Sequence, residues 1–267
     1  MSFKHQLASF VLSRALCQPD RPGENQHDPE FYTSHVPFGP LRGMRLSMRG
    51  FERPSFALGT YERHVVALLR RFVRPGFVAY DVGSHIGYLT LVLSRLVGDS
   101  GHVYSFEPDP ANLSALSRNV RINGISNVTL VGRAVTDRET SLRFAAFRYS
   151  LVNHIAGKNE PADASLITVP ATSLDHFVYE ENGDVPAVIK LDVEGAEADV
   201  LRGARRLLAE ARPILIAEVR AGEIWREIAD LLRENGYSAH LSASEQRRME
   251  RDGIADVLLT PEPAKGE

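Results

Sequence analysis

From residue 77 onward, the chain alternates between short apolar runs and longer segments with helical periodicity. Residues 77–82 form an apolar run with β-branched side chains, Gly83 follows, and residues 86–97 repeat their apolar positions with the period of a helix. Such alternation predicts an α/β fold with a doubly wound, mostly parallel sheet and helices on both faces. Because ligands of such sheets bind beyond the carboxyl ends of the strands, we expect functional residues directly after each strand.

The same alternation continues to the C-terminal region. Pro75 ends an amphipathic helix that begins near residue 60, and Asp109 followed by Pro110 is typical of a helix start. The other predicted strands cover residues 102–106, 128–131, 142–147, 187–191, 213–219, 237–241 and 254–260, and the other predicted helices cover residues 110–123, 197–208 and 224–235. Only a charged stretch separates the last two strands, which predicts an antiparallel C-terminal edge strand.

Residues 1–58 differ from the rest of the chain. They hold many prolines and glycines and do not alternate, so we expect an N-terminal extension of loops and short strands ahead of an α/β domain at residues 59–267. A polar stretch at residues 150–164 predicts an excursion loop inside that domain.

The composition argues against several classes of protein. No apolar run reaches the ~18 residues that a membrane span needs, and the first sixteen residues lack the apolar core of a secretion signal. The single cysteine, Cys17, has no partner for a disulfide bond or zinc site, so we expect a reducing, cytoplasmic setting. A net charge of −3 and the lack of aromatic residues among the N-terminal arginines predict that the protein does not bind nucleic acid.

The segment DVGSHIG, residues 81–87, lies where the first predicted strand gives way to a helix. Glycines at 83 and 87 let the backbone turn tightly and approach a ligand beside the unpaired amides of a helix N-terminus, which indicates a nucleoside cofactor. A dinucleotide fingerprint requires glycine where His85 stands, which makes NAD or FAD the weaker interpretation. A tight turn without a ligand is the structural alternative.

Glu107 ends the second predicted strand, twenty residues after Gly87. A carboxylate at this position can accept hydrogen bonds from both hydroxyls of a ribose, which agrees with a nucleoside cofactor at the glycine turn. An ordinary surface carboxylate is the alternative.

Three carboxylates follow a central strand within the segment KLDVEGAE, residues 190–197. Asp192, Glu194 and Glu197 would repel one another unless cations or catalysis make use of them, so the segment is typical of a functional site. Glu197 also has a structural interpretation, because an acidic residue in the first turn of a helix complements the helix dipole.

Together these segments resemble the S-adenosylmethionine-dependent methyltransferases of the FkbM type. The matching stretches are Tyr61-Glu62, DVGSHIG with Tyr88, GHVYSFEPDP at residues 101–110, NVRIN at residues 119–123, Ala134-Val135 with Asp137, Ser173-Leu174-Asp175, and KLDVEGAE with Leu201 and Gly203. The resemblance covers residues 60–220, and Ser84 and His85 stand where the family usually has Ala and Asn.

The resemblance implies a seven-stranded, Rossmann-like sheet whose last strand pair is reversed. It also implies S-adenosylmethionine as the cofactor and assigns the residues that bind it. In that assignment Asp81, Gly83 and Gly87 surround the methionine and ribose with Ser84 and His85 in the same turn, Glu107 holds the ribose hydroxyls, and Ala134 flanks the adenine.

The function expected from the resemblance is O-methylation of a hydroxyl on a small molecule or glycan. Asp192 and Glu194 are the leading candidates for the base or the acceptor anchor, and Glu218, near the end of the next strand, is a third. The turn at Gly195 is expected to leave Glu194 facing the pocket while Glu197 has entered the following helix. Histidines 85, 154 and 176 are weaker candidates for the base.

Three alternatives stay open at this point. Asp192 and Glu218 could share a Mg²⁺ ion, but hard cations take about six oxygen ligands and the sequence offers few, so we expect no metal. An NAD-dependent Rossmann oxidoreductase and a non-catalytic cofactor-binding module are the other two. The acceptor and the oligomeric state do not follow from the sequence.

Overall fold

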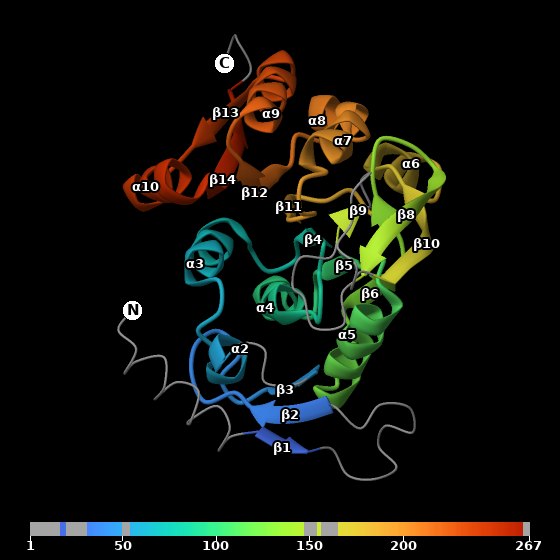
Figure 1. The fold of residues 1–267 in the computed structure, drawn as a ribbon, viewed down its shortest axis with the longest axis vertical. Coiled ribbons are helices and arrows are strands. Elements are labelled where there is room, and N and C mark those ends of the chain that lie inside the picture. Colours follow the sequence, from blue (N-terminus) through green and yellow to red (C-terminus); the bar gives the residue numbers. More distant parts are fainter. Residues whose placement is uncertain (1–16, 20–30, 50–53, 147–153, 156–164, 264–267) are drawn as a thin grey trace.

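The computed structural model describes residues 17–19, 31–49, 54–146, 154–155 and 165–263 (Figure 1). The central element is a seven-stranded sheet with the order β13-β14-β12-β11-β4-β5-β6. Its strands are β4 (Val78–Val82), β5 (His102–Phe106), β6 (Val128–Val131), β11 (Val188–Leu191), β12 (Ile214–Arg220), β13 (Tyr237–His240) and β14 (Ile254–Pro261). This sheet confirms the predicted fold class.

The antiparallel pairing lies at the C-terminal end of the sheet. Strands β12, β11, β4, β5 and β6 pair in parallel, whereas β14 is antiparallel to both β12 and β13. The reversed strand is therefore inserted one place in from the edge, and β13 forms the edge itself. Antiparallel pairing of the consecutive strands β13 and β14 predicts that one of them runs opposite to the rest of the sheet. It does not predict which of the two lies at the edge.

Helices cover both faces of the sheet (Figure 1). Adjacent β4 residues point to opposite faces, so Tyr80 belongs to one hydrophobic cluster and Ala79 to the other. The first face packs against α6 (Leu174–Tyr179), α7 (Glu197–Arg202), α8 (Arg205–Glu210) and α9 (Glu223–Glu234), and the second against α3 (Arg63–Phe72), α4 (Tyr88–Val97) and α5 (Pro110–Ile122).

Two predictions about helices were wrong. The predicted helix at residues 197–208 is divided into α7 and α8 at Gly203, where an added Cβ would lie 2.2 Å from the carbonyl oxygen of Thr136. The charged stretch at residues 245–252, predicted as a connection, lies in helix α10 (Ala243–Asp252). Among the described residues of α10 only Glu245 is buried, so an apolar stripe could not reveal this helix.

A second sheet flanks the carboxyl end of β6. It has the order β7-β10-β8-β9 and comprises β7 (Ala134–Val135), β8 (Thr140–Ala146), β9 (His154–Ile155) and β10 (Ser165–Thr172). The predicted strand at residues 142–147 is β8, whereas β10 was not predicted. Apart from β9, the predicted excursion loop lies outside the described residues.

The N-terminal segment forms a three-stranded sheet, β1 (Cys17–Pro19), β2 (Phe31–His35) and β3 (Arg45–Arg49), followed by α2 (Pro54–Leu58). Leu46 of β3 and Phe56 of α2 belong to the same hydrophobic cluster as α3 and α4. Asn119 of α5 and Asn123, the residue after this helix, continue the hydrogen bonding of β3, since their side-chain amides each bond both the N–H and the C=O of one β3 residue. The division of the chain at residue 58 stays a prediction.

Candidate functional site

A cavity of about 390 Å³ lies at the carboxyl ends of β4, β5, β11 and β12. Residues from each of the three motifs line it, including Gly83 of the glycine turn, Glu107 and Glu194. The three segments that the sequence singled out therefore meet in one place, at the edge of the sheet where parallel α/β folds bind their ligands.

The glycine turn packs directly against the end of β11. Gly83 has a φ of +80°, and a Cβ added there would lie 1.8 Å from the carbonyl oxygen of Asp192. Gly87 has a φ of +89°, and a Cβ there would lie 2.2 Å from Leu116. Both positions require glycine for backbone conformation and packing, and this requirement is compatible with a ligand beside the turn.

Asp81 lies behind the cavity wall rather than in it. Its side chain is fully buried, one carboxylate oxygen accepts a hydrogen bond from Thr90 at 2.6 Å, and the other lies 3.6 Å from the ammonium of Lys190. Lys190 in turn donates to the carbonyl oxygen of Gly83 at 3.0 Å. The geometry thus gives Asp81 a supporting position under the glycine turn.

Ser84 and His85 line the cavity through different parts of the residue. The Ser84 hydroxyl points back to the carbonyl oxygen of Phe106 at 2.8 Å, so it braces the turn. His85 has a left-handed φ of +52°, its backbone N–H donates to Glu107, and its ring stacks on Phe56 with centroids 6.2 Å apart.

Glu107 is held by the backbone on both sides. One carboxylate oxygen accepts from the N–H of His85 at 2.8 Å and the other from the N–H of Asp109 at 2.9 Å. Burial raises the pKa of Glu107 to about 7, against the opposing effect of these amides. Oε1 also accepts a long hydrogen bond from the side-chain amide of Asn112 at 3.4 Å, whereas Oε2 keeps a lone pair for a further donor such as a ribose hydroxyl.

The cavity beyond Glu107 is largely apolar. Ala134, Val135 and Phe144 line it there, at the start of the second sheet. Arg133 also reaches this wall, but its guanidinium is engaged by both carboxylate oxygens of Glu181 at 2.6 Å. The apolar wall suits the aromatic base of a nucleoside, and the buried carboxylate beside it suits the ribose hydroxyls.

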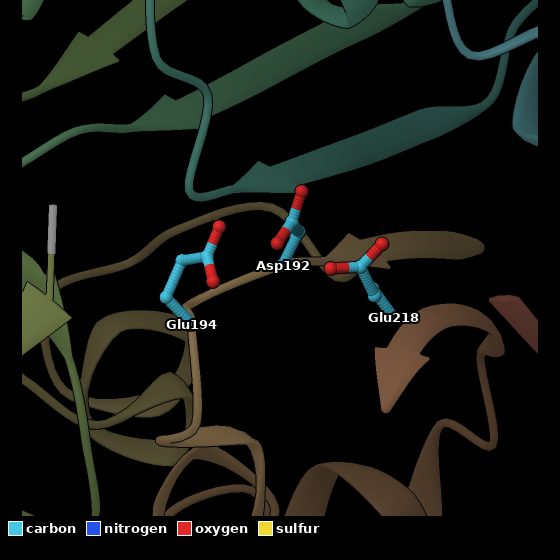
Figure 2. A group of neighbouring side chains, drawn as sticks. All are labelled: Asp192, Glu194 and Glu218. Carbon is cyan, nitrogen blue, oxygen red and sulfur yellow. The ribbon is translucent and has the colours of Figure 1, made fainter. Parts of the chain in front are cut away.

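The opposite end of the cavity carries three converging carboxylates, Asp192, Glu194 and Glu218, which we call the carboxylate cluster (Figure 2). Asp192 and Glu194 come from the segment after β11, and Glu218 from β12. One oxygen of each lies within 4.8 Å of the other two, a spacing that could surround a metal ion.

Each member of the carboxylate cluster already faces a cation. The distances are 3.5 Å from Lys190 to Asp192, 2.5 Å from Arg220 to Glu194 and 2.8 Å from Arg248 to Glu218. These cations offset part of the negative charge of the cluster, although Lys190 also faces Asp81 and Arg248 also faces Asp256. The absence of a catalytic metal stays a prediction.

Glu194 and Glu197 occupy different environments. Glu194 lines the cavity, and burial together with the charges of Asp192 and Glu218 raises its pKa to about 7 despite the nearby Arg220. Glu197 is 2% exposed and accepts hydrogen bonds from the N–H groups of Gly195 and Val193 at 3.0 and 3.3 Å. This placement agrees with the sequence-based expectation, although the chemical role of each residue stays a prediction.

Two lining residues, Arg248 and Phe56, come from segments that no motif indicated. Arg248 lies on α10 and also contacts Asp256 at 2.9 Å. Phe56, Tyr61 and Tyr88 form an aromatic wall, with ring centroids 4.1 Å apart for Phe56 and Tyr61. Tyr61 and Tyr88 belong to the matching stretches named above, whereas no sequence pattern indicated Phe56 or Arg248.

Glu62, which the matching Tyr61-Glu62 pair included, is a further acidic residue of the cavity lining, in addition to Glu107 and the carboxylate cluster. Burial, followed by the charges of Asp192 and Glu218, raises its pKa. Two of the histidines were weaker candidates for the base. His176 lies 3.4 Å from Glu181 and does not line the cavity, and the side chain of His154 is not among those that the structure describes.

Over the described part of the chain, no helix has both the length and the apolar character needed to cross a membrane.

The family model of the methyltransferase FkbM domain matches residues 81–239. The hexuronic acid methyltransferase AglP of Haloferax volcanii is 28% identical over 184 residues, which cover 68% of this chain and 72% of that protein. Methyltransferase 1 of Beauveria bassiana is 30% identical over 145 residues, 46% of this chain and 56% of its own length.

Solved structures of low sequence identity also align with the chain. The FkbM methyltransferase of Methylobacillus flagellatus aligns with a TM-score of 0.46 at 21% identity, over 78% of this chain and 52% of that one. Fibrillarin of Aeropyrum pernix, solved with natively bound S-adenosyl-L-methionine, aligns with a TM-score of 0.46 at 14% identity, over 91% of this chain and 99% of that one.

The matched range begins at the glycine turn, includes Glu107 and the carboxylate cluster, and ends on the edge strand of the sheet. The NAD-dependent oxidoreductase and the non-catalytic module are thereby set aside. The chain belongs to the FkbM methyltransferase family and is an S-adenosylmethionine-dependent methyltransferase.

Proposed function

We propose that this protein methylates a hydroxyl oxygen of a small molecule or glycan, with Glu194 as the base that takes up the hydroxyl proton. The proposal rests on one observation: the carboxylate cluster lines the same cavity as Glu107 and the apolar wall that suits a nucleoside. A methyl donor at one end and a proton acceptor at the other are the two components that the reaction needs.

The cofactor end of the cavity follows from the residues already described. The backbone of Gly83 and Gly87 would face the methionine and ribose, Glu107 would accept from the ribose hydroxyls, and Ala134 would flank the adenine. Ser84 and His85 would complete the same turn, and Asp81 would support it from behind. S-adenosylmethionine, when bound, supplies a methyl group already activated by a positively charged sulfur.

Glu194 has the properties of a general base. Its pKa of about 7 makes the carboxylate ionised above neutral pH and still basic enough to accept a proton. Asp192 and Glu218 face Lys190 and Arg248 at 3.5 and 2.8 Å, and both are suited to orient the acceptor hydroxyl by accepting a hydrogen bond.

A sugar acceptor fits the cavity's chemistry. Tyr61 and Phe56 present aromatic surface beside several carboxylates, a combination that suits the apolar faces and hydroxyl groups of a pyranose. The hexuronic acid methyltransferase among the relatives supports the same class. The expectations that the protein does not bind nucleic acid and works in the cytoplasm stay predictions.

A screen of glycosides and hydroxylated metabolites for release of S-adenosylhomocysteine tests the proposal. Treating the product with mild alkali separates a methyl ether, which survives, from a methyl ester, which is hydrolysed. An alkali-labile product would replace the hydroxyl by a carboxylate acceptor and would refute this part of the proposal.

Substitution of Glu194 by Gln tests the base. With the acceptor found in the screen, kcat is expected to fall by ~10²- to 10⁴-fold while the affinity for S-adenosylmethionine is retained. Glu197→Gln is the matched control and is expected to keep most of kcat. A wild-type kcat in Glu194→Gln would move the base to another member of the carboxylate cluster or to Glu62.

A further inference from the structure

Glu194 stands on a turn with an unfavourable backbone conformation. Its φ is +55°, in the left-handed region that non-glycine residues rarely adopt, and Gly195 follows with a φ of +105°. Such conformations persist at functional sites only where the surroundings hold them in place. The structure must therefore contain the groups that fix this turn.

Glu197 fixes the backbone of the turn from below. Its Oε1 accepts hydrogen bonds from the N–H groups on either side of Glu194, those of Val193 and Gly195. These bonds hold the main chain, but neither contacts the carboxylate of Glu194. The direction of the side chain requires a second support.

Arg220 provides that support from the neighbouring strand. Its Nη2 donates to Oε2 of Glu194 at 2.5 Å, and the two side chains are 40% and 18% exposed, respectively. Arg220 is the last residue of β12, where its register partner is Ile254 of β14, so its main chain belongs to the central sheet. The guanidinium thus reaches Glu194 from a fixed position.

The charges around Glu194 give this contact its importance. Asp192, from the same connection, and Glu218, from β12, disfavour a third negative charge beside them, whereas Arg220 favours it. The other charged groups nearby are directed elsewhere. Lys190 of β11 faces Asp192, Arg248 of α10 faces Glu218, and Glu62, the residue before α3, interacts with Asp192 and Glu218.

We infer that Arg220 is a positioning residue for the proposed methyl transfer: it holds the Glu194 carboxylate ionised and turned into the cavity. The inference rests on the proposed role of Glu194 as the base. It assigns Arg220 no contact with the reacting atoms, and it predicts that loss of the guanidinium impairs proton uptake rather than cofactor binding.

The first test requires no acceptor. The ¹³C-carboxyl resonance of Glu194, assigned by its disappearance in Glu194→Gln, is followed through a pH titration in the wild type, Arg220→Gln, Arg220→Met and Arg220→Lys. The wild-type midpoint is expected at about 7. Because Arg220 lowers the pKa of Glu194, the two neutral variants are expected to titrate at higher pH, and Arg220→Lys closer to the wild type.

The second test measures turnover with the acceptor from the screen. In Arg220→Gln the acidic limb of the kcat profile is expected to move to higher pH by the same amount as the midpoint, with an unchanged Kd for S-adenosylmethionine. At a pH below both midpoints, kcat should fall about tenfold for each pH unit of that shift. Arg233→Gln, which removes an exposed ion pair on α9, is the matched control and should leave every readout unchanged.

The outcomes separate the inference from the proposed function. If Glu194→Gln abolishes turnover but the neutral Arg220 variants keep the wild-type midpoint and pH profile, the inference fails and the base assignment stands. If Glu194→Gln keeps the wild-type kcat, the base assignment fails. The titration midpoints of Glu194 in the wild type and the Arg220 variants then show by themselves whether Arg220 holds that carboxylate. If neither neutral variant folds, Arg220 is a requirement for folding and the inference is overturned.

Discussion

Replacing Asn119 by Ala is expected to destabilise the protein strongly, although Asn119 does not line the cavity. Its amide is fully buried between α5 and β3, accepting from the N–H of Ser47 at 2.6 Å and donating to the carbonyl oxygens of Ser47 and Ile86 at 2.9 and 2.8 Å. Alanine would leave these three backbone groups without partners in a place that water does not reach.

The size of the effect follows from counting these groups. A buried backbone group left without a partner costs ~1–3 kcal/mol, so three of them cost about 3 kcal/mol even at the lower limit. The higher helix propensity of alanine returns at most ~0.7 kcal/mol. The net loss in the free energy of unfolding is therefore expected to be about 2–3 kcal/mol or more.

Asn123→Ala is the matched control, one helical turn later. Its amide makes the equivalent bonds to the N–H and C=O of Arg45, at 2.9 and 2.7 Å, but at an exposed position where water can replace them. The expected loss is below ~1 kcal/mol. Urea unfolding of both variants measures the difference. If Asn119→Ala is no less stable than Asn123→Ala, the reasoning from buried backbone groups is wrong.

Three further predictions concern the cavity. Glu107→Ala is expected to weaken S-adenosylmethionine binding by ~1–3 kcal/mol in isothermal titration, because the ribose hydroxyls lose their acceptor, and a wild-type affinity would contradict the ribose role. Exhaustive EDTA treatment is expected to leave turnover intact, since cations of the protein offset part of the negative charge of the carboxylate cluster; a loss that Mg²⁺ restores would establish a metal site. Turnover of the wild type is expected to decline below pH 7 as Glu194 becomes protonated, and a rate that is level from pH 5 to 8 would exclude a base of this pKa.

Local signals predicted the central sheet well. The bounds of β5 and β6 agree with the predicted strands, and Asp109 caps α5 by accepting from the N–H of Ala111 at 2.7 Å. Each of these elements has a strong local cause, either a short apolar run or a cap of defined chemistry. Their order along the chain then sufficed to identify the fold class.

Helix α10 shows where apolar periodicity is insufficient. Its residues are nearly all polar, yet Ser242 accepts from the N–H of Glu245 at 3.2 Å, as in an N-terminal cap with an acidic residue three positions later. That Ser-x-x-Glu pattern was the available signal. Helix α7 illustrates the opposite error, because the apolar period continues across Gly203 and hides a break imposed by the approach of Thr136.

The site was predictable only for residues that follow a strand within a motif. Glu107 and Glu194 could be located in this way, but their raised pKa values depend on burial and on charges from other elements. For Glu194 these charges include those of Glu218 and Arg220, both from β12. Contacts of this kind depend on tertiary structure and leave no local pattern.

The backbone contact between Gly83 and Asp192 links the two ends of the cavity mechanically. Since no side chain separates the turn after β4 from the end of β11, and Lys190 ties the same turn to that strand, the two segments are expected to shift together. The spacing between methyl donor and base is then a fixed dimension of the scaffold. Acceptor preference can diverge through the outer walls, Phe56 on α2 and Arg248 on α10, without altering that dimension.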